Sequence, residues 1–458
     1  MKTRYSVIII ASFNFFIGCE KSWLEAKPNS SLGTLSSVED CQALLDNSST
    51  LFNQNYPVFN EFSTSDYYLP YSVWNSRIPL IKNSYIWASD FYQGGSMVDW
   101  TLPYQQILNV NIVLNALDEL KIDQSNQDAF NLAKGTAFFY RAFAFFGLAQ
   151  EFCKPYIESS ASTDLGIPIR LTANVNDISI RSTVQQTYDQ ILSDLHSAET
   201  LLANNQTPSS QLTKTRATVA AVFAMYARTY LAMSNYTKAL SYSDSCLSLY
   251  NSLMDFTILS TSSPNPITNN PFNPEVIFFA TSINGGLGGI AIIDSMLYQS
   301  YTANDLRRVI FFTTTTGNPT YKGSYSASNG ALFAGLATDE IYLIRAECNA
   351  RAGNTVLAMN DLNTLLRKRW ATGTFVDYTA ANAASALNQI LVERRKELIF
   401  RTIRWTDLRR LNLDPQFAVT LSRNLNGQIY TFPPNDQKYV FAIPDAEIQL
   451  SGIQQNPR

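Results

Sequence analysis

The spacing of apolar residues in two long stretches, about 104–250 and 336–411, constrains the fold more than any other feature of this sequence. In LPYQQILNVNIVLNALDEL, apolar side chains recur every three or four residues, for example at Ile107, Val110 and Leu114. This is the period of an α-helix that buries one face. A strand would need strict alternation instead. The sequence therefore predicts a mainly α protein.

Two segments within these stretches resemble tetratricopeptide helix pairs, in which small residues let two antiparallel helices pack closely. The first has Ala227 followed by a turn at Ser234-Asn235, and the second has Ala346 followed by a turn at Gly353-Asn354. The two alanines lie 119 residues apart, which is not a whole number of repeats of about 34 residues. We therefore expect the helix pairs to be interrupted by an insert at about 251–335.

The expected organisation has one main domain behind an N-terminal leader. Hydrophobic residues make up 46% of the 458 residues and charged residues 16%, which is a globular composition. We expect a signal peptide at 1–18, a lipidated tether at 19–37 and a single domain at 38–458. Within it, residues 51–104 are expected to be rich in loops and the insert at 251–335 to hold a few short strands.

The first 19 residues have the three parts of a secretory signal. Lys2 and Arg4 precede an apolar run from Tyr5 to Ile17, which is shorter than the roughly 20 residues of a spanning helix. Gly18-Cys19 after an apolar pair resembles the lipobox of bacterial lipoproteins, although Phe16 stands where leucine is usual. This interpretation predicts cleavage before the cysteine and a diacylated Cys19. The alternative is ordinary signal-peptidase cleavage with an incidental cysteine.

Few residues have the pattern of a catalytic or metal site. The one histidine, His196, lies in a helical stretch, which argues against His-rich metal sites and Ser-His-Asp catalysis. Asp66, Asp90 and Asp99 lie among aromatic residues, but their spacing does not place two carboxylates at a working separation. The Gly-rich run at 285–289 lacks the Lys-Ser/Thr of a phosphate loop. We expect no enzyme activity, no cofactor and no metal.

The segment LVERRKELIFRTIRWTDLRRLNL, residues 391–413, combines charges with an apolar stripe. On a continuous helix Glu397 would pair with Arg401, and Arg404 with Asp407. We interpret the segment as a structural helix held by a charge network and a buried tryptophan. A ligand-binding role is the alternative.

Several motifs together resemble the SusD/RagB family, the surface lipoproteins that collect glycans for uptake in Bacteroidetes-type bacteria. In chain order they are Gly18-Cys19, a W…Y..I…N pattern at Trp100, Tyr104, Ile107 and Asn111, KG.A.FYRAFA.F at 134–146, ER..EL.F…RW.DLRR at 393–410, and FAIPDAEI followed by QNP at 455–457. The chain departs from the family at Arg401-Thr402, where Glu-Gly is usual. It also ends at Pro457-Arg458, where the family usually closes with Gly-Tyr.

The resemblance implies a non-catalytic binder built on a tetratricopeptide-like scaffold. Such a protein captures oligosaccharides and delivers them to a SusC-like TonB-dependent outer-membrane transporter. It would be anchored in the outer membrane through Cys19, facing the cell surface, with no nucleic-acid partner. The alternatives are a helical-repeat protein that binds peptides or another nutrient for the same type of transporter, and a glycosidase with an all-α fold.

The candidate ligand-binding residues come from the aromatic region and from the insert. Residues 51–104 hold 14 aromatic residues, about twice the density of the whole chain, among Pro, Asn, Ser and Gly. Tryptophan and tyrosine rings can stack on the apolar faces of sugars, while asparagine and arginine bond the hydroxyls. The candidates are Tyr68, Tyr71, Trp74, Asn75, Arg77, Tyr298, Tyr301, Tyr321 and Tyr325. We expect Trp100, Tyr104 and Trp405 in the core instead.

Overall fold

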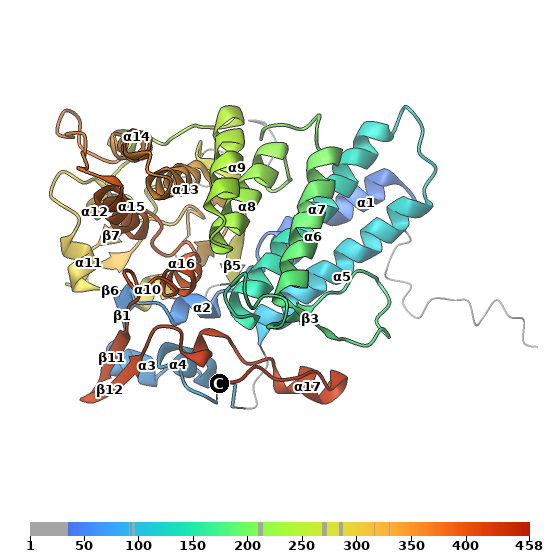
Figure 1. Cartoon of the computed structure of the whole chain (residues 1–458), viewed down its shortest axis with the longest axis horizontal. Coiled ribbons are helices and arrows are strands. Elements are labelled where there is room, and N and C mark those ends of the chain that lie inside the picture. Colours follow the sequence, from blue (N-terminus) through green and yellow to red (C-terminus); the bar gives the residue numbers. More distant parts are fainter. Residues whose placement is uncertain are drawn as a thin grey trace, which may run out of the picture.

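The computed structural model describes residues 35–90, 92–93, 97–208, 214–267, 273–283, 287–315, 317–328 and 330–458. The predicted signal peptide, Cys19 and most of the predicted tether lie outside the described residues. As predicted, the described chain is mainly α-helical with a few short strands (Figure 1). None of its helices is both long and apolar enough to cross a membrane.

The helices vary from single turns to more than seven turns. The α-helices are α1 Val38–Leu45, α2 Phe59–Phe62, α3 Tyr71–Asn75, α4 Pro79–Tyr85, α5 Val98–Glu119, α6 Gln127–Phe152, α7 Val184–Leu201, α8 Val219–Ala232, α9 Tyr236–Leu249, α10 Leu287–Ile290, α11 Ser295–Gln299, α12 Arg307–Ile310, α13 Thr338–Arg351, α14 Thr355–Leu366, α15 Ala383–Glu397, α16 Arg404–Leu411 and α17 Asp445–Ser451. The π-helical turn Ser48–Phe52 and the 3₁₀ turns Phe256–Ile258 and Gln437–Tyr439 complete the set.

The strands pair antiparallel in one four-stranded sheet, in the order β1-β6-β8-β7, and in four two-stranded sheets, β10-β4, β11-β12, β2-β3 and β5-β9. They are β1 Tyr67–Tyr68, β2 Leu165–Pro168, β3 Arg181–Thr183, β4 Val276–Phe278, β5 Thr281–Ile283, β6 Ile292–Ile293, β7 Phe312–Thr313, β8 Thr320–Tyr321, β9 Ala331–Phe333, β10 Leu336–Ala337, β11 Leu421–Leu425 and β12 Gln428–Phe432.

Local capping explains where several helices begin. Ser37 caps α1 and forms a capping box with Asp40. For α7 the capping box belongs to Thr183 and Gln186, and the helix begins at Val184.

The two predicted tetratricopeptide-like pairs are α8 with α9 and α13 with α14, and α13 also packs against α9 and α15 (Figure 1). Ala227 and Ala346 are fully buried, so the helix backbones can approach closely. Two residues beyond the end of each first helix lies a left-handed residue, Ser234 with φ 57° and Gly353 with φ 85°. The predicted turns therefore reverse the chain at the expected places.

The insert contains short strands, as expected, but one strand-like piece is a helix in part. EVIFFATSI forms β4 and β5, whereas RRVIFFTTTT begins as α12 and becomes strand β7 only at Phe312. Arg307 opens α12, and its buried guanidinium reaches Asp305, two residues earlier and outside the helix, at 2.7 Å.

The expectation of one continuous helix over 391–413 is wrong. The first helix, α15, ends at Glu397 and α16 begins at Arg404, and between them Phe400 and Thr402 adopt left-handed φ angles of 53° and 57°. The residues between the two helices therefore turn the chain in a direction that an α-helix cannot follow.

The ion pairs expected along that helix do not form either. Arg401 instead pairs with Asp339 at 2.8 Å, and Glu397 with Arg307 and Arg369. Asp407 pairs with Arg394 and Arg410, and Arg404 approaches Asp66 at 3.5 Å. The network joins distant segments rather than successive helical turns.

A large apolar cluster runs through most of the described chain, and a smaller one lies among α13, α14 and α15. Trp405 is fully buried against Phe432, Tyr439 and Phe441, as expected. Cysteines 153, 246 and 348 are buried free thiols. The scaffold is therefore held by a continuous core and a buried ion-pair network.

Candidate functional site

The predicted loop at 67–77 forms an exposed aromatic surface, here called the aromatic platform and made of Tyr68, Tyr71 and Trp74. Successive side chains of a strand point to opposite sides, so Tyr67 of β1 is buried while Tyr68 is 40% exposed. On the short helix α3, Tyr71 and Trp74 lie three residues apart and share one face. Tyr71 is 45% exposed, and Trp74 is half-buried beside it.

Two rings of the platform, those of Tyr71 and Trp74, contact each other, and neighbouring groups hold Trp74 in place. The Tyr71 and Trp74 ring centroids are 5.8 Å apart with an interplanar angle of 40°. Trp74 donates its indole N–H to the Lys82 carbonyl at 3.1 Å. The Lys82 ammonium lies 4.6 Å from the centroid of the same ring and donates to Asn75 at 3.0 Å. A preorganised ring loses little rotamer freedom when a ligand stacks on it.

The predicted polar partners lie on the same helix and just after it. Asn75 ends α3 with an exposed side chain, and its amide oxygen accepts from Lys82. Arg77 is half-buried and donates through Nε to the Val73 carbonyl at 3.2 Å, which leaves its terminal nitrogens for other acceptors. The amide and the guanidinium therefore stand beside the platform as possible partners for ligand hydroxyls.

Buried charges attach the platform to the helical scaffold. Asp66, directly before β1, accepts from Arg395 of α15 at 2.7 Å. Its carbonyl accepts from the Asp294 backbone N–H at 2.9 Å, which joins β1 to the residues before α11. Burial, together with the charge of Asp66, raises the pKa of the neighbouring Glu61 to about 8. The base of the platform thus includes a carboxyl group that keeps its proton at neutral pH.

The C-terminal hairpin β11–β12 contacts the residues before and after the platform through Arg423. Arg423 of β11 donates to the carbonyls of Thr64 and Tyr67. Its guanidinium lies 4.3 Å from the Tyr85 ring centroid and 5.0 Å from that of Trp87. The platform is therefore held by residues that are more than 300 positions away in sequence.

Of the four tyrosines predicted in the insert, only Tyr298 reaches the surface. It lies on α11 and is half-buried, with the Arg308 guanidinium 4.8 Å from its ring centroid and Phe312 edge-on at 5.6 Å. One side of the ring is thus covered by a cation. Tyr298 stays a candidate contact residue on the segment next to β1.

The other three tyrosines lie in the core, which corrects the expectation that they contact ligand. Tyr301 donates to the Lys396 carbonyl at 2.8 Å, and the Tyr325 hydroxyl bonds the buried Glu275 carboxylate. Tyr321 packs edge-on against Phe400 at 4.9 Å. At 3% exposure or less, none of these rings can stack on a sugar unless the core opens. They pack beneath the insert instead.

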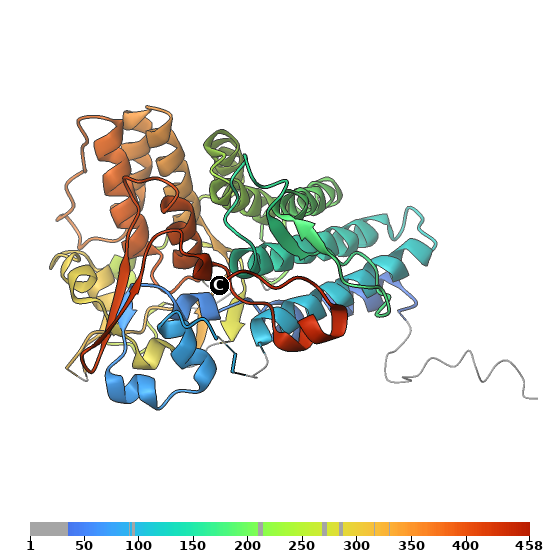
Figure 2. The same ribbon diagram turned by 60° about the horizontal axis from the view of Figure 1, so that its bottom comes forward.

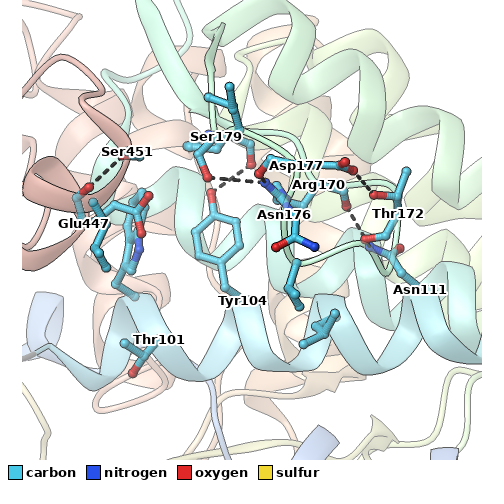
Figure 3. Close-up of a pocket in the computed structure, with 16 residues that line it drawn as sticks. Thr101, Tyr104, Asn111, Arg170, Thr172, Asn176, Asp177, Ser179, Glu447 and Ser451 are labelled. Carbon is cyan, nitrogen blue, oxygen red and sulfur yellow. Dashed lines mark hydrogen bonds between the residues drawn. The ribbon is translucent and has the colours of Figure 1, made fainter. Parts of the chain in front are cut away.

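An open cavity lies elsewhere, between α5, the loop 169–180 and α17 (Figure 3). This α5–α17 cleft has a volume of about 690 Å³. Trp100 is in its floor, 4% exposed as expected of a core residue, but Tyr104 is only half-buried and lines the cleft. Sequence reasoning missed this cleft, because its residues come from three distant segments. The Asn, Asp and Ser cluster of the loop was the available signal.

Two protein-family models match the sequence. A SusD-like model, described as starch-binding and associating with the outer membrane, matches residues 22–231, and the model of the SusD family matches residues 299–458. Together these matches cover about four fifths of the chain. No protein with curated annotation matches.

Solved structures of this family share the fold. A SusD superfamily protein from Bacteroides thetaiotaomicron VPI-5482 has a TM-score of 0.74 at 20% identity, with 92% of this chain and 100% of that chain covered. A SusD superfamily protein from Bacteroides fragilis has a TM-score of 0.70 at 22% identity, with 92% and 99% covered. A SusD-like carbohydrate binding protein from Bacteroides vulgatus ATCC 8482 has a TM-score of 0.66 at 21% identity, with 91% of this chain and 96% of that chain covered.

The motifs from Trp100 to the C-terminus, the two family models and the shared helical fold agree with one another. The chain belongs to the SusD/RagB family.

Proposed function

We propose that this protein is a non-catalytic, cell-surface glycan-binding lipoprotein. It captures oligosaccharides on the aromatic platform and delivers them to a SusC-like TonB-dependent transporter in the outer membrane. The observation that carries the proposal is the platform itself, in which Tyr68, Tyr71 and Trp74 are presented on a rigid support with Asn75 and Arg77 beside them. The starch-binding description of the matching family model and the carbohydrate-binding relative support the ligand class.

The chemistry of the platform suits an extended sugar chain. An aromatic ring excludes water from the apolar C–H face of a sugar, and amide and guanidinium groups bond the hydroxyls at its edge. Such a site holds a ligand without proton transfer or a nucleophile. An open surface also accommodates an oligomer, whereas an enclosed pocket would limit the length of the ligand.

The substitution Trp74→Ala tests the platform. Truncating a central aromatic anchor costs about 2 kcal/mol, roughly thirtyfold in Kd. We expect the variant to lose most of its retention in affinity electrophoresis on gels that contain starch or other neutral polysaccharides. The control is Ile78→Ala, which removes a side chain that is 60% exposed near the platform but is not aromatic. Equal retention of wild type and Trp74→Ala would rule out this site.

The non-catalytic part of the proposal has its own test. Purified protein incubated with each retained polysaccharide should release no reducing ends over a day. Release that depends on this chain would favour a glycosidase. Retention of peptides but of no polysaccharide would favour the peptide-import alternative instead.

The lipid anchor on Cys19 lies outside the described residues and rests on the sequence motif. Two acyl chains hold a protein stably on a membrane, whereas one is marginal. Cys19→Ala should therefore release the protein from the membrane fraction into the medium. A variant that remains in the outer-membrane fraction after high-salt washing would contradict lipidation at this residue.

A further inference from the structure

We propose that the α5–α17 cleft is a second carbohydrate site, separate from the aromatic platform, which takes a neutral sugar. The inference goes beyond the proposed function, because it depends on different residues and would hold even if the platform bound something else. Four features of the cleft lead to it: its aromatic floor, two unpaired polar groups, a preformed wall, and charged side chains of both signs in its lining.

The floor is a pair of aromatic rings on one face of α5. Trp100 and Tyr104 are one helical turn apart, with ring centroids at 4.8 Å and an interplanar angle of 51°. Phe152 packs edge-on against Trp100 at 4.9 Å. The Tyr104 hydroxyl donates to the Pro168 carbonyl at 2.8 Å. Both rings are therefore fixed, and the half-buried Tyr104 supplies the apolar surface on which a sugar face can stack, with Trp100 packed against it.

Two polar groups in the cleft have no partner. Trp100 is 4% exposed, yet within the described part of the chain its indole N–H finds no acceptor. The nitrogen atom itself is not fully buried, so it can donate to water or to a ligand in the cleft. The carboxylate of Glu447 on α17 also lines the cleft and makes no side-chain hydrogen bond or ion pair to a described residue. A donor and an acceptor beside an aromatic floor match the hydroxyl groups of a sugar.

The wall opposite α17 is already folded into a fixed shape. Arg170 donates to the Asn174 carbonyl at 2.8 Å and also to the Asp177 carbonyl, and the Asp177 carboxylate accepts from Thr172 and Asn174. Asn111 of α5 donates to the carbonyls of Arg170 and Thr172 at 3.1 and 3.0 Å. A preformed wall lowers the ordering cost of binding.

The charges around the cleft favour a neutral ligand. Figure 3 shows Tyr104 rising from α5 between Glu447 of α17 and the loop that carries Arg170 and Asp177. An anionic ligand would meet the carboxylates of Glu447 and Asp177, and a cationic one would meet the guanidinium of Arg170, so either would lie close to a like charge. The volume of about 690 Å³ leaves room for more than one sugar ring.

The cleft and the platform lie on the same side of the molecule. In Figure 1, α3, α4 and α17 lie along the lower side, and Figure 2, in which that side comes forward, shows all three. A long glycan that reaches both sites would gain from the high effective concentration of the second contact.

The test is a titration of the full chain with neutral oligosaccharides, followed by the indole N–H signals in nitrogen-15 NMR spectra. The neutral probes are malto-, cello-, xylo- and mannohexaose. Chitosan hexamer, which is cationic, and galacturonate hexamer, which is anionic, serve as charged comparison ligands. The Trp100 and Trp74 signals are assigned from the variants Trp100→Phe and Trp74→Ala. A neutral probe should shift the Trp100 signal in wild type and also in Trp74→Ala.

The decisive variant is Glu447→Gln. Replacing a charged acceptor by a neutral one should weaken the titration of the Trp100 signal about tenfold. Asp445→Asn, on the same helix but outside the cleft lining, should leave it unchanged. A neutral probe that moves Trp74 but not Trp100 overturns the second site and leaves the proposed function standing.

The remaining outcomes also separate the two proposals. A probe that moves Trp100 alone supports the cleft and counts against the platform. Tighter titration by either charged hexamer overturns the assignment of a neutral ligand. If no probe moves either signal, both proposals fail.

Discussion

At the scale of single residues, two buried carboxyl groups hold the start of helix α2 within the aromatic region 51–104. Asp99 accepts from the backbone N–H groups of Val58 and Phe59 at 2.7 and 2.6 Å, and Glu151 accepts from that of Asn60 at 3.1 Å. These donors belong to the start of α2, which has no side-chain cap of its own. Burial and the charge of the neighbouring Asp99 raise the pKa of Glu151, which favours a proton on one carboxyl of the pair.

Glu151→Gln tests this proton through the pH dependence of stability. Burial raises the pKa of Glu151 well above its usual value and that of Asp99 to about 6. The folded state therefore holds protons that the unfolded chain releases, and this contribution is present at low pH and lost as pH rises. Each proton held only in the folded state lowers the free energy of unfolding by up to about 1.4 kcal/mol for each unit of rising pH. A neutral glutamine holds no such proton, so this pH dependence should be smaller in the variant. Urea unfolding at pH 5 to 8 should give a flatter profile for Glu151→Gln than for wild type. Glu39→Gln, at an exposed position, should parallel wild type, and parallel profiles for all three would contradict a proton held by this pair.

At the scale of elements, the break between α15 and α16 shows why a helix can be predicted while its end is missed. The apolar stripe of Leu391, Leu398 and Trp405 keeps a spacing of seven residues across the break, so periodicity alone favours one helix. The helices that begin with their own caps, such as α1, are predictable because the signal is local. The break is determined by partners elsewhere, since Arg401 pairs with Asp339 of α13.

The candidate site divides in the same way. Tyr68 faces the surface because side chains alternate along the strand β1. Tyr71 and Trp74 share one face of α3 because they are three residues apart on a helix. The tyrosines of the insert have no such period, and whether they are covered depends on contacts such as that of Tyr321 with Phe400. Burial of this kind depends on the tertiary fold and cannot be inferred from neighbouring residues.

Thr402→Gly tests the conformation of the break. Thr402 has φ 57°, which is unfavourable for a β-branched residue by about 1–2 kcal/mol and not for glycine. This is also the position where the family usually has glycine. We expect Thr402→Gly to be more stable than Thr402→Ala by about 1 kcal/mol, because both lose the threonine side chain and only glycine escapes the strain. Thermal unfolding of the two variants gives the comparison, and a more stable alanine variant would refute a left-handed residue here.

At the scale of the whole molecule, buried ion pairs tie the insert to the helical scaffold. Arg369, which follows α14, donates to Glu397 of α15 and to Glu275 of the insert, each at 2.7 Å. Glu397 also pairs with Arg307 of α12 at 3.0 Å. The side chains of all four residues are fully buried. Three separate parts of the chain thus meet in one desolvated cluster.

Arg369→Met tests whether this cluster holds the molecule together. Removing one partner leaves Glu275 without its ion pair in the interior, which costs about 3–5 kcal/mol. The matched control is Arg367→Met, two residues earlier, because Arg367 pairs with Asp377 where both side chains are 51% exposed. An exposed pair contributes roughly 1 kcal/mol or less.

The measurement is urea unfolding of the whole chain, followed separately by tryptophan fluorescence and by far-ultraviolet circular dichroism. We expect the midpoint of Arg369→Met to fall far below that of Arg367→Met. Because the cluster joins the insert, through Glu275 and through Arg307 of α12, to α15 and to the segment after α14, both signals should move together. If the two substitutions cost the same, the cluster contributes no more than a surface pair. If the fluorescence midpoint alone moves, the insert unfolds by itself and is not tied to the helices through Arg369.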